Sequence, residues 1–174
     1  MDDQRRNFEA TALPHMDAAY NLARWLSRSS ADADDIVQDA MLRAFRGFGG
    51  FRGENVRPWL LAIVRNCWRS RAADTQRRGH TVLSAEDDRP LVADGPDPET
   101  EALRASESRR LAAVITGLPE DFREVLILRE MEDMSYLEIA ETTGVPIGTV
   151  MSRLARARAM LRDQWIAKDR DVVR

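Results

Sequence analysis

The sequence predicts an all-α fold: two small helical domains joined by a flexible acidic linker, the second containing a helix-turn-helix. Apolar residues recur at spacings of three and four on both sides of one interruption, and strand-like alternation is hard to find. The interruption itself is rich in proline and acidic residues. The predicted ranges are 7–78 for the first domain, 79–105 for the linker and 106–165 for the second domain.

Composition excludes several classes of protein. Charged residues make up 32% and hydrophobic residues 44% of the 174-residue chain, which is typical of a globular protein. We expect no membrane span, and the charged residues 1–6 lack the apolar stretch of a secretory signal, so we expect a cytoplasmic protein. The single Cys67 has neither a second thiol nor a histidine pair to complete a zinc site. We therefore expect a buried thiol, no metal and no cofactor.

The first domain contains a predicted amphipathic helix over residues 31–48. Its apolar stripe consists of Ile36, Val37, Ala40, Met41, Ala44 and Phe45. The residues that face away from this stripe are polar or charged apart from one leucine: Asp35, Gln38, Asp39, Leu42, Arg43 and Arg46. A solvated face explains this composition as well as a binding surface does.

A glycine-rich loop and a partly basic helix follow. Four glycines between residues 47 and 53 predict the loop, and Pro58 fits the first turn of the helix. A nucleotide-binding loop is excluded, because no strand precedes the glycines and no Gly-Lys-Ser/Thr follows them. The helix combines arginines with aromatic residues, a mixture that suits separated DNA strands. We place Trp68 in the core and leave Trp59 open between core packing and base stacking.

The formal net charge of −3 argues at first against binding to nucleic acid, but the charge is segregated along the chain. The linker carries helix-breaking and acidic residues, namely Pro90, Pro96, Pro98, Glu86, Asp87, Asp88, Asp94, Asp97, Glu99 and Glu101. Residues 65–78 and 153–162 are basic with few compensating acids. Two segments can therefore contact phosphates despite the acidic total.

The second domain carries the predicted helix-turn-helix. Ser135 and Glu138 have capping-box spacing, Gly144 can end the first helix in the left-handed conformation, and Pro146 fits the start of the next helix. The second helix should bury Val150, Leu154, Ala157 and Leu161. The opposite arc consists of Thr149, Ser152, Ala155 and Arg156, flanked by Arg153, Arg158 and Arg162. This surface suits a DNA major groove, whereas a solvated basic helix in an ordinary bundle is the alternative.

Three segments resemble the extracytoplasmic-function (ECF) sigma factors of the sigma-70 family. The segment LPEDFREVLILREMEDMSYLEIAETTGVPIGTVMSRLARARAMLR closely resembles sigma region 4. ADADDIVQDAMLRAFRGF resembles region 2.2, and GFGGFRGENVRPWLLAIVRNCWRSRAA resembles regions 2.3 and 2.4. The resemblance covers roughly residues 10–78 and 106–163 in the family order.

The resemblance implies a role for each segment in transcription initiation. Contact with the −35 promoter element is implied for Thr149, Ser152, Arg153, Arg156 and Arg158. Contact with the −10 element is implied for Phe51, Arg52, Asn55, Trp59, Asn66 and Arg69. Binding to core RNA polymerase is implied for Asp35, Gln38 and Leu42. Met151 departs from the family, which usually has Lys or Arg there, so the −35 preference is expected to differ.

The expected partners are core RNA polymerase, promoter DNA and, by family analogy, an anti-sigma factor. The resemblance also implies that the linker lies along the basic RNA path of the polymerase, with a solvated tether as the alternative. We do not expect an enzyme, because no paired catalytic constellation is recognisable.

Two other functions are compatible with parts of the sequence. A sigma-mimicking protein that sequesters an anti-sigma factor should lose its promoter-facing basic groups, and Arg65, Arg69, Arg153 and Arg156 argue against it. A stand-alone helix-turn-helix regulator would fail to bind core polymerase.

Overall fold

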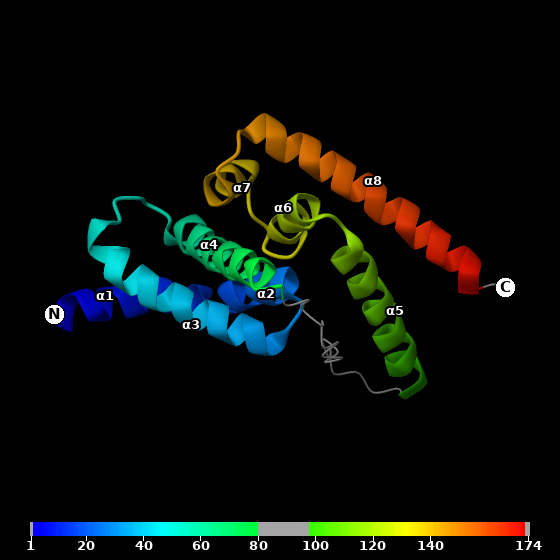
Figure 1. Cartoon of the computed structure of the whole chain (residues 1–174), viewed down its shortest axis with the longest axis horizontal. Helices are drawn as coiled ribbons and strands as arrows, with labels where there is room; N and C mark the ends of the chain where they lie inside the picture. The colour runs from blue at the N-terminus through cyan, green and yellow to red at the C-terminus, as the bar shows by residue number, and fades with distance from the viewer. Residues whose placement is uncertain (1, 80–97, 173–174) are drawn as a thin grey trace.

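A computed structural model of the chain describes residues 2–79 and 98–172 (Figure 1). The described residues contain helices and no strand, which confirms the predicted all-α class. The α-helices are α1 (Asp2–Ala12), α2 (Met16–Ser27), α3 (Ser30–Gly47), α4 (Val56–Arg77), α5 (Pro98–Gly117), α6 (Glu120–Glu130), α7 (Tyr136–Thr143) and α8 (Ile147–Val172), with short 3-10 turns at Leu13–His15 and Phe48–Gly50. Within these ranges, no helix combines the length and apolarity needed to cross a membrane.

Helices α1 to α4 form the N-terminal bundle, in which α2, α3 and α4 pack against one another. The apolar stripe predicted for α3 largely faces this core, since Ile36, Val37, Ala40 and Ala44 are buried. Ser29 begins α3 by accepting a hydrogen bond from the backbone N–H of Asp32. Trp68 of α4 is 8% exposed, as the sequence predicts.

Helices α5 to α8 form the C-terminal bundle, in which α7 and α8 form the helix-turn-helix and pack against α6. The Ser135 hydroxyl accepts from the backbone N–H of Glu138, whose carboxylate accepts from the backbone N–H of Ser135. Gly144 ends α7 with φ of 72°, in the left-handed region that an L side chain disfavours. The predicted capping box and helix end are thus both present. Helix α5 packs along α8, where the Arg110 guanidinium lies 4.1 Å from the Trp165 ring centroid.

The start of α5 differs from the predicted linker. Residues 98–105 belong to this helix, whereas the sequence assigned them to a linker over 79–105. Pro98 lies at the start of α5, and the first turn of a helix accepts proline because no backbone donor is needed there. The rest of the proposed linker, residues 80–97, lies outside the described residues.

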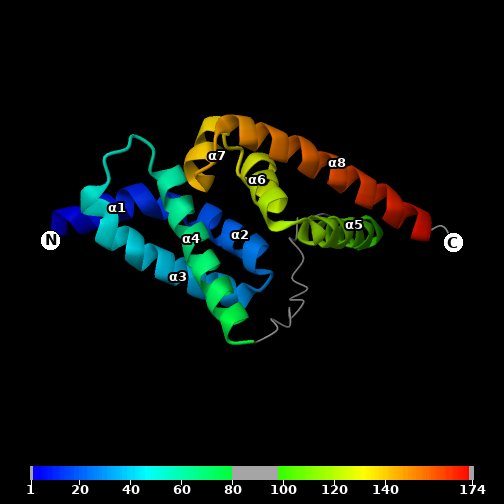
Figure 2. The same ribbon diagram turned by 45° about the horizontal axis from the view of Figure 1, so that its top comes forward.

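The two bundles pack directly on each other. Helix α4 contacts α7, and α2 contacts α6, so α4 lies between the N-terminal helices and the helix-turn-helix (Figures 1 and 2). Buried apolar residues of both bundles belong to one cluster. The sequence predicts two domains joined by a flexible linker, but such a linker does not reveal whether the domains it joins also bind each other.

Candidate nucleic-acid and polymerase interfaces

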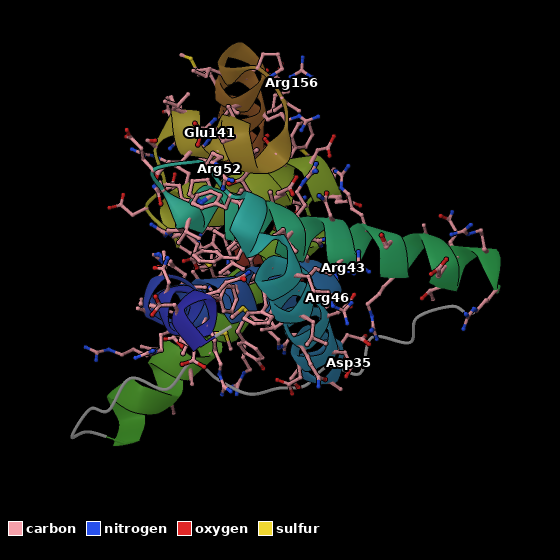
Figure 3. All side chains as sticks on the ribbon, turned by 90° about the vertical axis from the view of Figure 1, so that its left-hand side faces the viewer. Asp35, Arg43, Arg46, Arg52, Glu141 and Arg156 are labelled. Atoms are coloured by element: carbon pink, nitrogen blue, oxygen red, sulfur yellow. The ribbon has the colours of Figure 1, made fainter. Side chains whose placement is uncertain are left out.

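The recognition helix α8 presents the arc that its sequence predicts. Val150, Leu154 and Ala157 are at most 1% exposed and hold the helix against α6 and α7. Ser152, Arg156 and Arg158 are exposed, and Thr149 is half-buried. Figure 3 shows Arg156 at the outer surface of the C-terminal bundle, well separated from Asp35 of the N-terminal bundle. The exposed arc therefore faces away from the first bundle.

Two of the arginines predicted to contact the −35 element already have carboxylate partners. Arg153 Nη2 lies 2.9 Å from Asp121 Oδ2, and its side chain is only 21% exposed. Arg153 therefore lies at the edge between the buried and the exposed arcs of α8, where the sequence places it as a residue that flanks the outward arc. Arg158 donates to Glu130 Oε1 at 2.6 Å, which raises the pKa of its guanidinium.

The α3 face predicted to bind polymerase is exposed. Asp35, Gln38 and Leu42 all reach solvent, and Leu42 is 51% exposed. Arg71 of α4 donates to Asp35 Oδ2 at 3.1 Å, an exposed contact that a partner can displace. Beside these residues lies a mainly apolar groove, whose walls also include Phe8, Met16, Tyr20, Val37, Met41 and Phe45. Phe8 of α1 and Met16 and Tyr20 of α2 are not predictable from the sequence as part of this surface, because only the tertiary packing brings them next to α3.

Three of the residues predicted to contact the −10 element line one pocket. Phe51, Trp59 and Asn66 surround it together with Arg43, Gly47, Gly50 and Ile63. The ring centroids of Phe51 and Trp59 are 4.9 Å apart, so the half-buried Trp59 forms part of the pocket wall. A Cβ at Gly53 would lie 2.8 Å from the Phe51 ring, and glycine therefore allows the loop to fold back over this ring. Arg43 was not predicted here, although it lies on the polar face of α3.

The loop itself is held by Arg52, another predicted −10 residue. Its guanidinium donates to the carbonyl oxygens of Gly49 at 2.8 Å and Phe51 at 3.0 Å. The side chain remains exposed (Figure 3). Arg52 is therefore accessible to a ligand while it helps to fix the loop.

The remaining −10 residues, Asn55 and Arg69, face the C-terminal bundle. Asn55 caps α4 by accepting from the backbone N–H of Arg57, and its amide donates to Glu138 Oε1 at 2.8 Å. Arg69 Nη2 lies 3.3 Å from carboxylate oxygens of both Glu120 and Asp121. The structure thus separates these two side chains from the pocket around Phe51 and Trp59.

Arg65 is the clearest departure from the expected DNA-facing surface. It is 8% exposed and donates to the carboxylate of Glu124, which is completely buried. Burial raises the pKa of Glu124 despite the opposing effects of Arg65 and Arg69. The helical arc of Arg65 is visible in the sequence, but its partner, 59 residues away, is not.

Comparison with known proteins identifies the two bundles. The family described as "Sigma-70 region 2" matches residues 13–78, and "Sigma-70, region 4" matches residues 108–161. The ECF RNA polymerase sigma-E factor of Haemophilus influenzae is 35% identical over 150 residues, which cover 82% of this chain and 78% of that protein. The RNA polymerase sigma-H factor of Pseudomonas aeruginosa is 33% identical over 161 residues, which cover 88% and 83% respectively. The ECF sigma factor SigE of Mycolicibacterium smegmatis is 35% identical over 156 residues, but the match spans only 59% of its length.

Solved structures agree with this assignment. The sigma factor RpoE of Bartonella quintana, solved with the anti-sigma factor NepR, has a TM-score of 0.74 at 26% identity, covering 95% of this chain and 98% of that one. CnrH, solved with the cytosolic domain of CnrY, has a TM-score of 0.66 at 28% identity, covering 94% and 90% respectively. The chain belongs to the ECF sigma factors of the sigma-70 family, the non-enzymatic proteins that direct RNA polymerase to promoters, and the resemblance noted in its sequence is confirmed.

Proposed function

We propose that this chain is a cytoplasmic alternative sigma factor that contacts the −35 element through α8, the −10 element through the α4 region, and core polymerase through α3. The observation that carries the proposal is the two-sided character of α8. One arc is buried against α6 and α7, while the opposite arc exposes Ser152, Arg156 and Arg158. Residues 147–162 contain four arginines and no acid.

For the −35 element, the exposed arc of α8 is suited to the major groove, which is wide enough to admit a helix. Arg156 is the strongest candidate for a base contact, because it is an exposed arginine within this arc, whereas Arg153 and Arg158 flank it. Ser152, Thr149 and Arg158 can add hydrogen bonds to bases or phosphates, and Arg153 can do so if it leaves Asp121. Met151 is 53% exposed on the same surface and carries no charge, so we propose that the −35 preference departs there from the family pattern.

For the −10 element, the pocket between Phe51 and Trp59 offers aromatic surfaces for an unstacked base. Asn66 adds a hydrogen-bonding amide to the pocket. Arg52, which is exposed and follows Phe51 in the chain, can contact the DNA backbone. Asn55 and Arg69 extend this surface along α4 once their carboxylate partners are displaced.

For core polymerase, the exposed α3 face combines two kinds of contact. Asp35 and Gln38 can pair with basic groups, whereas Leu42 and the adjoining groove can bury an apolar ridge of a partner helix. An anti-sigma factor is a further proposed partner, because the similar sigma factor RpoE of Bartonella quintana was solved in complex with the anti-sigma factor NepR.

The proposal is tested with purified protein, sigma-free core polymerase and a library of genomic promoter fragments. We expect initiation at a defined set of promoters. Arg156→Ala should weaken promoter binding by about 1–3 kcal/mol while core binding stays unchanged. Asp35→Ala should weaken core binding and leave the isolated chain's DNA contacts unchanged.

Two negative results would have different meanings. If the chain bound no core polymerase but still bound specific DNA, a stand-alone helix-turn-helix regulator would replace the present proposal. If it bound polymerase yet initiated at no promoter, the assignments of α4 and α8 would be wrong.

A further inference from the structure

An apolar row runs along the exposed side of α8 from the first turn of the helix. Ile147, Met151 and Ala155 are spaced by four residues, so each is turned by only about 40° from the one before it. Ile147 is 42% and Met151 is 53% exposed, and Ala155 is exposed as well. A Cβ added at Gly148, beside this row, would meet no neighbouring atom within 4 Å in the described part of the chain. The row is therefore open to a ligand.

The surroundings of the apolar row are basic. Arg156, Arg158 and Arg162 are exposed on the same helix, and residues 147–162 contain no acid. Guanidinium groups without compensating acids attract phosphates, so the charge favours duplex DNA as the occupant of this surface. In a helix-turn-helix, the N-terminal residues of the second helix contact base edges. The apolar row occupies that part of α8, and Arg158 and Arg162 follow it.

The major groove offers a methyl group on one base alone, the C5 methyl of thymine, beside hydrogen-bond donors and acceptors. The thioether of Met151 is only a weak acceptor and donates nothing. Against guanine it would leave the O6 and N7 acceptors without partners, which costs their desolvation. Against thymine it buries the methyl group, and the unbranched methionine side chain can adapt its shape to that contact. Met151 therefore favours thymine.

Ser152, the next residue, supplies a second and independent preference. Its hydroxyl donates to the Thr149 carbonyl oxygen at 3.0 Å, so its lone pairs are what it still offers to a ligand. An acceptor at this position matches the amino group of adenine or cytosine. A thymine–adenine pair carries both a methyl group and an amino group on its major-groove edge. One base pair thus satisfies Met151 and Ser152 together.

We propose that Met151 is a specificity-determining residue, which selects a thymine in the −35 element by burying its C5 methyl group while Ser152 accepts from the paired adenine. This inference rests on the proposed role of α8 in −35 binding. Ile147 and Ala155 extend the apolar surface on either side of Met151 along the helix.

The test uses holoenzyme assembled from the full chain and core polymerase. Its probes are duplex fragments of a promoter that the holoenzyme uses, with the −35 region randomised, and sequencing of the bound fragments gives the preferred −35 sequence. Each thymine of that sequence is then replaced singly by uracil, which lacks only the methyl group, and affinity is measured by fluorescence anisotropy. The matched variants are Met151→Ala and Met131→Ala, because Met131 is an exposed methionine at the end of α6, outside the recognition helix.

We expect uracil at one thymine to weaken wild-type binding about fourfold, the factor that corresponds to the burial of one methyl group. Met131→Ala should show the same loss, whereas Met151→Ala should bind the thymine and uracil duplexes equally. Met151→Arg should shift the preferred base at that position from thymine to guanine, because arginine pairs with O6 and N7 of guanine. Uracil loss that persists in Met151→Ala, or no uracil loss at any thymine, would overturn the role of Met151.

Arg156→Ala separates this inference from the proposed function of α8. If Arg156→Ala weakens binding to the preferred sequence but Met151→Ala keeps the uracil loss, α8 reads the −35 element and only the role of Met151 is wrong. If Arg156→Ala weakens binding to the thymine and uracil duplexes by the same factor and Met151→Ala abolishes the uracil loss, both proposals are supported. If randomisation yields no preferred sequence, or neither substitution changes affinity for it, both proposals fail.

Discussion

Truncating Leu154 to alanine should destabilise the C-terminal bundle far more than truncating its neighbour Met151. Leu154 is 1% exposed and belongs to the buried cluster with Ile139, Val150 and Ala157. Leu154→Ala removes buried methyl groups and leaves a cavity, at a cost of about 2–5 kcal/mol. Met151 is 53% exposed, so Met151→Ala should change stability by no more than about 0.5 kcal/mol.

Urea unfolding followed by far-UV circular dichroism measures both variants against the wild type. Promoter binding adds a functional readout: Leu154→Ala should lose −35 binding as the helix loses its support, while core binding through α3 persists. Met151→Ala should leave stability unchanged and affect only DNA preference. Equal destabilisation by the two substitutions would contradict the orientation assigned to α8, which buries Leu154 and exposes Met151.

Three further predictions concern buried or titrating groups. Glu124→Ala should lower the free energy of unfolding, measured with urea, by about 3–5 kcal/mol, because Arg65 keeps a buried charge without a partner. The double substitution Glu124→Leu with Arg65→Met removes both charges and should leave the free energy of unfolding unchanged or raise it. A double variant less stable than Glu124→Ala would contradict this account. The hydrogen bond from the backbone N–H of Ser135 lowers the pKa of Glu138. The ionised Glu138 side chain therefore stabilises the fold fully above the ordinary glutamate pKa, and this stabilisation is lost as the pH falls through the lowered pKa. Glu138→Gln should remove that part of the acid dependence in a pH titration of thermal stability, and an unchanged profile would exclude this role. Burial raises the pKa of Cys67 to about 11, so iodoacetamide at pH 8 should alkylate the thiol only after unfolding, as mass spectrometry can show.

The sequence by itself determined the parts of this protein that depend on local interactions. The capping box of Ser135 and Glu138 and the left-handed Gly144 were predictable, because each involves groups only a few residues apart. The buried arc of α8 and the exposed positions of Asp35, Gln38 and Leu42 followed from helical periodicity, which states which side of a helix is apolar. The beginning of α5 at Pro98 was missed because proline both breaks helices and begins them.

Only the tertiary structure decided which partners those helical faces meet. Arg65 and Arg69 lie on the predicted partly basic helix and Asn55 lies just before it. Their partners lie 59, 51 to 55 and 83 residues away, respectively. Arg43 likewise joins the pocket of Phe51 and Trp59 only through the packing of α3 against α4. Helical periodicity fixes the direction in which a side chain points around the axis of its own helix. The angle and distance between two helices depend instead on how their surfaces pack together. That packing is why arginines expected to face DNA are bound to carboxylates in the free chain.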